Sequence, residues 1–164
     1  MTGCGNDAYL DIETTGLSPT DSYITVVGIY LCGGGNSQFI QLVGEDVTPG
    51  NILNALKDVD TLYTYNGSRF DLPFIQSALG VELGARCLHR DLMYDCWRNN
   101  LYGGFKSVEA QLGIPRQTKG VDGWEAVKLW WRHQAGDSGA LDLLLRYNRE
   151  DVLNLKALRE RLAR

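Results

Sequence analysis

Two acidic residues interrupt a short apolar segment near the start of the chain, residues 8–13. The segment has the alternation of a β-strand, in which residues two apart point to the same face, so the carboxylates of Asp11 and Glu13 lie side by side. Carboxylates held together repel one another unless a cation lies between them. The fold must therefore give this strand either a solvated outer face or a metal site, and the pair alone favours neither.

The turn after this strand favours the metal site. Residues 14–17 combine two hydroxyl side chains, Thr14 and Thr15, with Gly16 and Leu17. A glycine in such a turn lets the backbone approach a ligand closely. The turn therefore weakens the alternative of an ordinary solvated edge strand.

A second motif spans residues 65–71 and is followed by a Leu-Pro pair. An aspartate before Leu-Pro is typical of a helix N-cap, and capping alone would explain Asp71. A helix N-terminus also attracts phosphate groups. Asn66 could contact a substrate or stabilise the loop, and Arg69 could contact a phosphate or be solvated.

The third motif, residues 147–151, lies in a long stretch with helical periodicity. Residues four apart share a helix face, so Tyr147 and Asp151 are expected side by side. An ordinary amphipathic helix surface is the alternative explanation of this pair. We expect the intervening Arg149 and Glu150 to be solvated.

The three motifs together supply four carboxylates, those of Asp11, Glu13, Asp71 and Asp151. Hard oxygen ligands of this kind are what Mg²⁺ or Mn²⁺ requires. Two such ions, roughly 3.5–4 Å apart, can clamp the attacking and leaving oxygens of a phosphodiester. The acidic motifs therefore predict a metal-dependent nuclease that uses two divalent cations.

The predicted elements begin with strands and end with helices. We expect strands at residues 8–13, 23–32, 38–43, 61–65 and 87–89, with the fourth parallel to the first. We expect helices at residues 49–59, 72–79, 92–100, 107–112, 124–134 and 141–162. An antiparallel meander of three strands followed by strand–helix units and then helices is the order of a ribonuclease-H-like α/β fold, a mixed sheet flanked by helices.

Length and composition fit one globular domain, residues 1–164, because 44% of the residues are hydrophobic and 22% are charged. The sequence has no apolar run of about eighteen residues to span a membrane. It also lacks the features of a signal peptide, so we expect a cytoplasmic protein. The net charge of −4 argues against tight non-specific binding to long duplexes. It does not exclude nucleic acid, because two divalent cations would offset it.

The cysteines Cys4, Cys32, Cys87 and Cys96 show no pairing pattern. We expect free thiols, with Cys32 and Cys87 as small core residues. A zinc site formed by Cys87, His89 and Cys96 would lack a fourth ligand, so we do not predict one.

Three tryptophans and two lysines complete the candidates for substrate contacts. Trp124, Trp130 and Trp131 could stack on bases, but large aromatic residues at helical spacing more often belong to the core, and we favour the core. Lys106 and Lys119 could contact backbone phosphates, and solvated side chains are the equal alternative.

The motifs closely resemble those of the DEDD superfamily of 3′–5′ exonucleases, in its tyrosine branch. The Asp-x-Glu, Asn-x-x-x-Phe-Asp and Tyr-x-x-x-Asp patterns occur in the order of that family. The histidine branch would have His at the position of Arg146. A narrower group, the YprB-like ribonuclease-H-like domains, is similar over residues 9–158, although Phe105 stands where that group more often has a small residue or Leu. The shared stretches are Asp11-Ile-Glu-Thr-Thr-Gly-Leu, Tyr65-Asn-Gly-x-x-Phe-Asp-Leu-Pro-Phe, His89-Arg-Asp-Leu, Lys106-Ser-Val-Glu-x-x-Leu-Gly-Ile and Tyr147-Asn-x-x-Asp-Val.

The resemblance implies a role for each catalytic side chain. Asp11 would bridge two ions, and Asp71 would hold the second ion largely through water. Glu13 and Asp151 would complete the first ion site. Tyr147 would orient the attacking water rather than take its proton, because a phenol with a pKa near 10 is a poor base at neutral pH.

The resemblance also implies where a nucleic acid would bind. Thr14 and Leu17 would touch the terminal nucleotide, with Leu17 wedged against a base. Asn66 and Phe70 would support the scissile end. The expected substrate is the 3′ end of DNA or RNA, with single-stranded ends favoured.

Two alternatives to an exonuclease stay open on the sequence. The first is a non-catalytic nucleic-acid-binding module of the same fold, which the loss of any one acid would support, and none is lost. The second is a structure-specific endonuclease of similar fold, in which the pair of Tyr147 and Asp151 is less expected.

Overall fold

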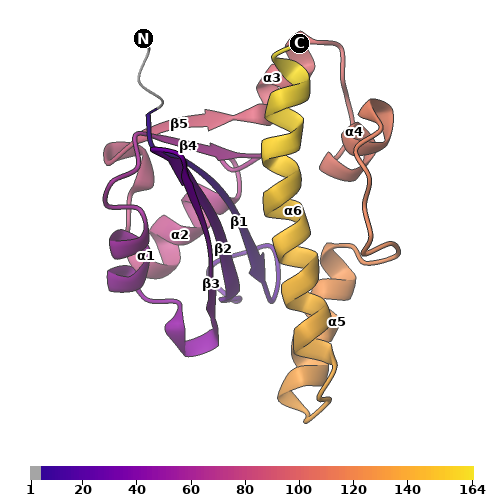
Figure 1. The fold of residues 1–164 in the computed structure, drawn as a ribbon. Helices are drawn as coiled ribbons and strands as arrows, with labels where there is room; N and C mark the ends of the chain where they lie inside the picture. The colour runs from indigo at the N-terminus through magenta and orange to yellow at the C-terminus, as the bar shows by residue number, and fades with distance from the viewer. Residues whose placement is uncertain (1–4) are drawn as a thin grey trace.

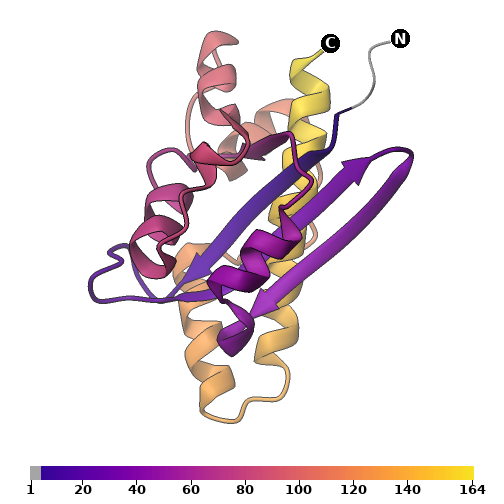
Figure 2. The same ribbon diagram turned by 90° about the vertical axis from the view of Figure 1, so that its left-hand side faces the viewer.

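The computed structural model describes residues 5–164. A five-stranded mixed sheet in the order β3-β2-β1-β4-β5 lies at its centre, with helices on both faces (Figures 1 and 2). The strands are β1 (Asp7–Thr14), β2 (Ile24–Gly33), β3 (Asn36–Val43), β4 (Thr61–Thr64) and β5 (Leu88–Asp91). The helices are α1 (Pro49–Ala55), α2 (Asp71–Leu79), α3 (Leu92–Arg98), α4 (Phe105–Leu112), α5 (Gly123–Gln134) and α6 (Ala140–Leu162), with short 3₁₀ segments η1 (Gly44–Asp46) and η2 (Leu83–Ala85). This is the fold class that the sequence predicts.

The first three strands form the predicted antiparallel meander. Gly34 and Gly35 join β2 to β3 between the paired residues Gly33 and Asn36. Their φ angles are 56° and 79°, a conformation that glycine adopts without a steric penalty and that a two-residue hairpin requires. β4 and β5 then continue the sheet parallel to β1, as expected for residues 61–65.

The two faces of β1 point into different layers. Its even-numbered residues from Ala8 to Ile12 are buried in a core with α1 and α2. Tyr9 points the other way, into a core that contains residues of α3, α4 and α6. Because side chains alternate along a strand, Asp11 and Glu13 share this second face with Tyr9. They therefore lie on the side of the sheet that α6 covers (Figure 1).

A glycine in β2 sets how closely α6 approaches the sheet. A Cβ atom added at Gly28 would lie 2.2 Å from Oδ1 of Asn148 and 2.8 Å from Cγ2 of Val152. Both neighbours belong to the buried face of α6. Without a side chain at Gly28, α6 packs directly on β1 and β2. Residues 147–151 of α6 therefore lie next to Asp11 and Glu13 of β1.

Most element boundaries lie one or two residues from those predicted, and two of the differences have a clear physical reason. Helix α1 ends at Ala55 rather than at residue 59, because the backbone of Leu56 leaves helical geometry and the N–H of Val59 bonds the Leu56 carbonyl at 3.1 Å. This turn buries Val59 and directs the chain into β4. Strand β5 covers Leu88–Asp91 rather than residues 87–89, since its pairing with β4 continues until Asp91 lies opposite Thr64.

The cysteines of the described residues are free thiols. Cys96 is buried, whereas Cys32 and Cys87 are half-buried and pack against the margins of the two cores, so the core prediction holds only in part for these two. Cys32 lies near the end of β2, where the hairpin leaves the body of the sheet, and Cys87 follows η2. Cys4 lies outside the described residues. No helix between residues 5 and 164 has the length and apolar character needed to cross a membrane.

Candidate metal centre

The acidic residues of β1 and α6 meet at one place. Asp11 and Glu13 come from β1 and Asp151 from α6, and one carboxylate oxygen of each lies within 4.8 Å of the others. Glu13 and Asp151 are buried, and Asp11 is half-buried. The alternation of β1 and the close packing of α6 thus bring together three of the four acids that the sequence singles out. Within residues 5–164, the side chains close enough together to hold a metal ion are these three acids. Cys87 and His89 are not among them.

The fourth acid, Asp71, approaches from the other side of β1. Its Oδ2 accepts a hydrogen bond of 3.1 Å from the N–H of Ile12, which lies between Asp11 and Glu13. The alternative explanation of Asp71 as a helix N-cap does not hold, because the N-cap of α2 is Phe70 and Asp71 is the first helical residue. The side chain of Asp71 is buried and anchored to β1 instead of turning back on its own helix.

Burial and mutual repulsion make these carboxylates hard to ionise. Burial, with the neighbouring charge of Asp151, raises the pKa of Glu13 to about 8. Burial raises the pKa of Asp71 to about 7, against the bond from the Ile12 N–H. The pKa of Asp11 is raised well above its ordinary range by burial and then by the charges of the surrounding acids. Without a cation, the site therefore holds protons at neutral pH.

The residues present fit a divalent metal ion. Among residues 5–164, Oε1 of Glu13 is a buried oxygen with no hydrogen-bond donor. Buried polar atoms are almost always paired, and an unpaired carboxylate oxygen on a residue that lies beside two other carboxylates is suited to a cation. All the candidate ligands are hard oxygens, which suits Mg²⁺ or Mn²⁺ rather than a thiol-seeking metal.

Arg116 forms a second layer behind the acids, and the sequence did not single it out. Its Nη2 donates to Oδ1 of Asp151 at 2.5 Å and to Oε1 of Glu109 at 2.6 Å. The guanidinium is 11% exposed. The pKa of Asp151 is raised by burial, and Arg116 opposes that rise. Arg116 therefore orients Asp151 towards β1 and stabilises its charge.

Lys106 contacts the tyrosine of the third motif. Its Nζ donates a hydrogen bond of 2.7 Å to the hydroxyl of Tyr147. A lysine ammonium has no acceptor, so the proton of the Tyr147 hydroxyl stays free to be donated elsewhere. Burial raises the pKa of Tyr147 far above its ordinary value, and nearby acids add to the rise. Tyr147 is therefore a neutral hydrogen-bond donor at the edge of the acidic cluster.

Asn148 is a second residue that sequence reasoning missed. It is fully buried, and its Nδ2 lies 3.2 Å from the carbonyl oxygen of Asp11 and 3.4 Å from Oδ2 of the same residue. Gln41 of β3 donates to Oδ1 of Asn148 at 3.0 Å, which fixes the orientation of the amide. The position next to Tyr147 in the third motif was the one signal that could have identified Asn148.

A cleft of about 900 Å³ opens onto the acids. Its lining includes four of the predicted substrate contacts: Thr14, Leu17, Asn66 and Phe70. Leu17 is 87% exposed, so its side chain is accessible to a ligand in the cleft. Asn66 has a positive φ of 60°, and its Oδ1 is buried with no partner among the described residues. The other two predicted contacts, Arg69 and Lys106, do not line this cleft.

The tryptophans divide between core and surface. Trp130 is buried against Val26 and Leu144, as predicted. Trp124 and Trp131 are 65% and 49% exposed, so the core prediction is wrong for both. Trp124 lies in the first turn of α5, where its side chain extends into the cleft lining instead of packing on α6.

The predicted solvation of Glu150 is wrong. Its Oε1 accepts hydrogen bonds from the N–H and the hydroxyl of Thr118, and its Oε2 accepts one from the N–H of Gln117. These bonds fix the loop that follows Arg116, so Glu150 holds this loop against α6. Arg149 is exposed, as expected, and lies over the ring of Phe39.

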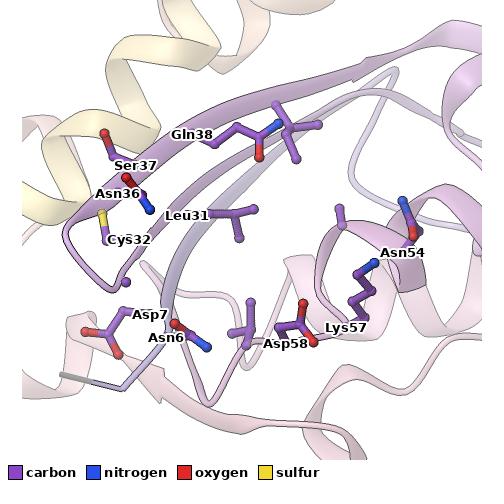
Figure 3. Close-up of a pocket in the computed structure, with 14 residues that line it drawn as sticks. Asn6, Asp7, Leu31, Cys32, Asn36, Ser37, Gln38, Asn54, Lys57 and Asp58 are labelled. Atoms are coloured by element: carbon purple, nitrogen blue, oxygen red, sulfur yellow. The ribbon is translucent and has the colours of Figure 1, made fainter. Parts of the chain in front are cut away.

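A second cavity, of about 720 Å³, lies at the opposite end of β1 (Figure 3). It is lined by polar residues of the β2–β3 hairpin, of α1 and of the turn after α1, including Gln38, Asn54 and Lys57. Asp7 at its margin pairs with Arg159 of α6 at 2.6 Å. None of the four acids lines this cavity, so the chemistry that they offer belongs to the cleft at the other end of the strand.

Solved structures with the same fold include nucleases and a polymerase. The family B DNA polymerase from the hyperthermophilic archaeon Pyrobaculum calidifontis superposes with a TM-score of 0.75 at 19% identity, covering 98% of this chain and 25% of the polymerase. NrnC of Brucella melitensis bound to pGG gives 0.64 at 23% identity, covering 96% of this chain and 72% of that one. The same protein with bound Mg²⁺ gives 0.65 at 23% identity, with coverages of 97% and 72%. At these identities the similarity concerns the fold, and the chain spans about a quarter of the polymerase.

No curated protein matches the sequence. A model of the RNase_H superfamily matches residues 8–163, which is nearly the whole chain. The matched range contains the five-stranded sheet, the four acids and Tyr147. The protein therefore belongs to the RNase_H superfamily.

Proposed function

We propose that the protein is a metal-dependent 3′–5′ exonuclease that removes nucleotides from single-stranded ends with two divalent cations. The observation that carries this proposal is the convergence of Asp11, Glu13 and Asp151, with one oxygen of each within 4.8 Å of the others. Asp71 adds a fourth carboxylate at the same stretch of β1. The similarity in fold to NrnC, whose structures contain pGG or Mg²⁺, supports a nucleic-acid substrate and a magnesium cofactor.

In this proposal Asp11, Glu13 and Asp151 hold one ion, and Asp11 and Asp71 hold the other. Bound divalent ions would supply a water of lowered pKa and would stabilise charge on the phosphate. Arg116 orients Asp151 and opposes the rise in its pKa before any ion binds. The amide of Asn148 performs the same positioning for Asp11.

Tyr147 positions the attacking water rather than deprotonating it. Its pKa is raised by burial, so its hydroxyl remains protonated throughout the neutral range. The bond from Lys106 occupies a lone pair of that hydroxyl and leaves its proton available as a donor. The tyrosine can therefore donate to a water or to a phosphate oxygen in the cleft.

The cleft holds the terminal nucleotides of the strand. Leu17 and Trp124 are exposed apolar side chains from two different elements that line it, and both can pack against base faces. Thr14 and Asn66 provide hydrogen-bonding groups, and the unpaired Oδ1 of Asn66 can accept a bond from the substrate. Phe70 supports the scissile end. We further propose that residues 1–164 act as a single domain.

A non-catalytic module would not retain this arrangement without a gain. Four buried or half-buried carboxylates with raised pKa values destabilise the metal-free fold, and neutral substitutions would relieve that cost. Retention of all four is expected of a protein that uses them to hold metal.

The test is digestion of DNA and RNA oligonucleotides labelled at the 5′ end, in Mg²⁺, in Mn²⁺ and in EDTA. The expected result is a ladder that shortens one nucleotide at a time from the 3′ end, only with metal. A strand blocked by a 3′-terminal phosphorothioate should resist digestion. Internal cuts in the blocked strand would replace the exonuclease proposal with an endonuclease, and no digestion with any metal would reject nuclease activity.

A further inference from the structure

A group of arginine and aromatic side chains lies on the surface outside the cleft lining. We define the basic–aromatic patch as Arg69, Arg90, Tyr94, Trp97 and Arg98. The guanidinium carbon of Arg69 lies 5.4 Å from the ring centroid of Trp97 and 5.8 Å from that of Tyr94. The two rings, one turn apart on α3, meet edge to face at 5.2 Å. Trp97 is 36% exposed, so the arginine does not cover the ring.

The patch is positively charged on a chain that is acidic as a whole. Asp95 contacts Arg90 at 3.1 Å and Arg98 at 3.3 Å, and both arginines remain more than half exposed. Three arginines against Asp95 and the buried Asp91 leave one positive charge, whereas the whole chain carries −4. Exposed pairs of this kind contribute little to stability, so stabilising α3 does not account for this concentration of arginine.

The patch lies at the same edge of the sheet as the acidic cluster. Strands β1, β4 and β5 are parallel, so their carboxyl ends face the same way. Asp11 and Glu13 lie in the carboxyl-terminal half of β1, and the cleft residues Asn66 and Phe70 follow β4. Strand β5 runs directly into α3 (Figure 1). Because neighbouring strands are about 4.8 Å apart, α3 begins roughly 10 Å from β1.

A buried aspartate fixes the patch relative to the cleft. Asp91 accepts hydrogen bonds from the N–H of Asn66 at 2.8 Å, from the hydroxyl of Ser68 at 2.6 Å and from the N–H of Met93 at 3.1 Å. The first two donors belong to the loop that carries Arg69, and the third opens α3. Cleft loop, Arg69 and α3 are thus joined through one carboxylate.

We propose that the basic–aromatic patch binds the part of a single strand that precedes the nucleotides held in the cleft. A base would stack on Trp97, and the arginines would contact the adjoining phosphates. The assignment rests on the proposed nuclease function for the identity of the occupant. Rings that offer their faces beside guanidinium groups suit unpaired bases on a polyanion, whereas a duplex hides its base faces.

The test compares a dinucleotide with a single strand of about twelve nucleotides. Binding of the labelled long strand is measured by fluorescence anisotropy with Ca²⁺ in place of Mg²⁺, and kcat/KM is measured for both substrates with Mg²⁺. The variant is Trp97→Ala, and Trp97→Phe keeps a ring. The matched control is Trp131→Ala, because Trp131 is 49% exposed and lies on α5, outside the cleft lining and the patch.

Trp97→Ala should weaken binding of the long strand at least about fivefold, the low end of the loss of one stacked base. Trp97→Phe should restore most of this loss. The kcat/KM for the dinucleotide should stay within about twofold of wild type, because a dinucleotide does not reach the patch. Arg69→Ala should also reduce the slope of log K against log salt by about 0.7, the value for one phosphate contact on a single strand. Arg132→Ala, an exposed arginine of α5, should leave that slope unchanged.

An equal loss for both lengths, or no loss for either, would overturn the assignment of the patch. So would an effect of Trp131→Ala as large as that of Trp97→Ala. The outcome for the proposed function is read separately. Binding that depends on Trp97, without cleavage of any oligonucleotide, would keep the patch and reject the nuclease. Normal cleavage by the wild type, with Trp97→Ala affecting the dinucleotide and the long strand equally, would keep the nuclease and reject the patch.

Discussion

Replacing Glu13 by glutamine should stabilise the metal-free protein at alkaline pH, although it removes a proposed ligand. The change keeps the size and shape of the side chain and removes its charge. Glu13 is 7% exposed, and one of its oxygens has no donor among residues 5–164. Asn148 and Lys106 favour the ionised form, but burial outweighs them, so ionisation of Glu13 costs more in the folded protein than in the unfolded chain, where water solvates the carboxylate.

The magnitude follows from the pKa of Glu13, which rises from its ordinary 4.5 to about 8 in the folded protein. Below pH 4.5 both states hold the proton, and Glu13 costs nothing. Between pH 4.5 and 8 the unfolded chain releases the proton while the folded protein keeps it, so the free energy of unfolding falls as pH rises. At about 1.4 kcal/mol per pH unit the loss approaches 5 kcal/mol at pH 8. This is an upper bound, because the glutamine amide is buried as well, and we expect a gain of about 2 kcal/mol or more.

The assay is urea denaturation in EDTA at pH 5 and pH 8, for wild type and Glu13→Gln. The gain should be small at pH 5 and large at pH 8. Glu82→Gln serves as the control, because Glu82 is exposed and caps η2 without a side-chain hydrogen bond. In saturating Mg²⁺ the order should reverse, since the variant binds the ion more weakly. Equal stability of wild type and variant at pH 8 in EDTA would refute the account of Glu13 as an incompletely compensated buried carboxylate.

Four further outcomes follow from the geometry. Millimolar Mn²⁺ or Mg²⁺ should raise the melting temperature of the wild type, and an unchanged melting curve together with no heat of binding would remove the metal site. Asp11→Ala should abolish digestion while the fold stays intact or becomes firmer; cleavage at the wild-type rate would exclude Asp11 as the bridging ligand. Tyr147→Phe should lower kcat by about 10²–10⁴ while its metal affinity stays near that of the wild type. Asp151→Asn should lower kcat and also weaken metal binding. Equal metal affinities of the two variants would contradict these roles. Arg116→Met should reduce the free energy of unfolding by about 3–5 kcal/mol in urea at pH 7, because two buried carboxylates lose their partner, and a change below about 1 kcal/mol would refute that.

Local periodicity predicted most of the strands and helices, and it predicted which side chains lie together within each of two acidic motifs. The period of two in β1 places Asp11 and Glu13 on one face, and the helical period of α6 places Tyr147 beside Asp151. Both rules depend only on neighbours in sequence. That the two pairs meet depends on Gly28, a position in β2 that carries no motif and whose role is visible only once α6 is packed on the sheet.

The residues that sequence reasoning missed are those whose role depends on distant partners. Arg116 follows a helix end and a proline, and an arginine in such a position is ordinarily expected to be solvated. Its guanidinium nevertheless contacts Asp151, which is 35 positions later in the chain. Asp71 was predicted as a ligand, but the capping alternative could not be dismissed from the sequence, because a cap and a first helical residue share the same sequence pattern. Trp124, Trp130 and Trp131 occur at helical spacing. Spacing alone does not show which side of α5 faces α6, so it could not separate the buried Trp130 from the exposed Trp124.

The placement of charge around the acids also favours a cation from solution over an internal one. Arg116 and Lys106 oppose the rise in the pKa of Asp151, and Lys106 also opposes that of Glu13. On the side of β1, within residues 5–164, the hydrogen-bond donors to the acids are the Ile12 N–H and the amide of Asn148, which are neutral. Neutral donors cannot cancel the charges of Asp11 and its neighbours, whose pKa values stay raised. Positive charge that enters here must come through the cleft, and a metal ion held there would in turn attract a phosphate to the same place.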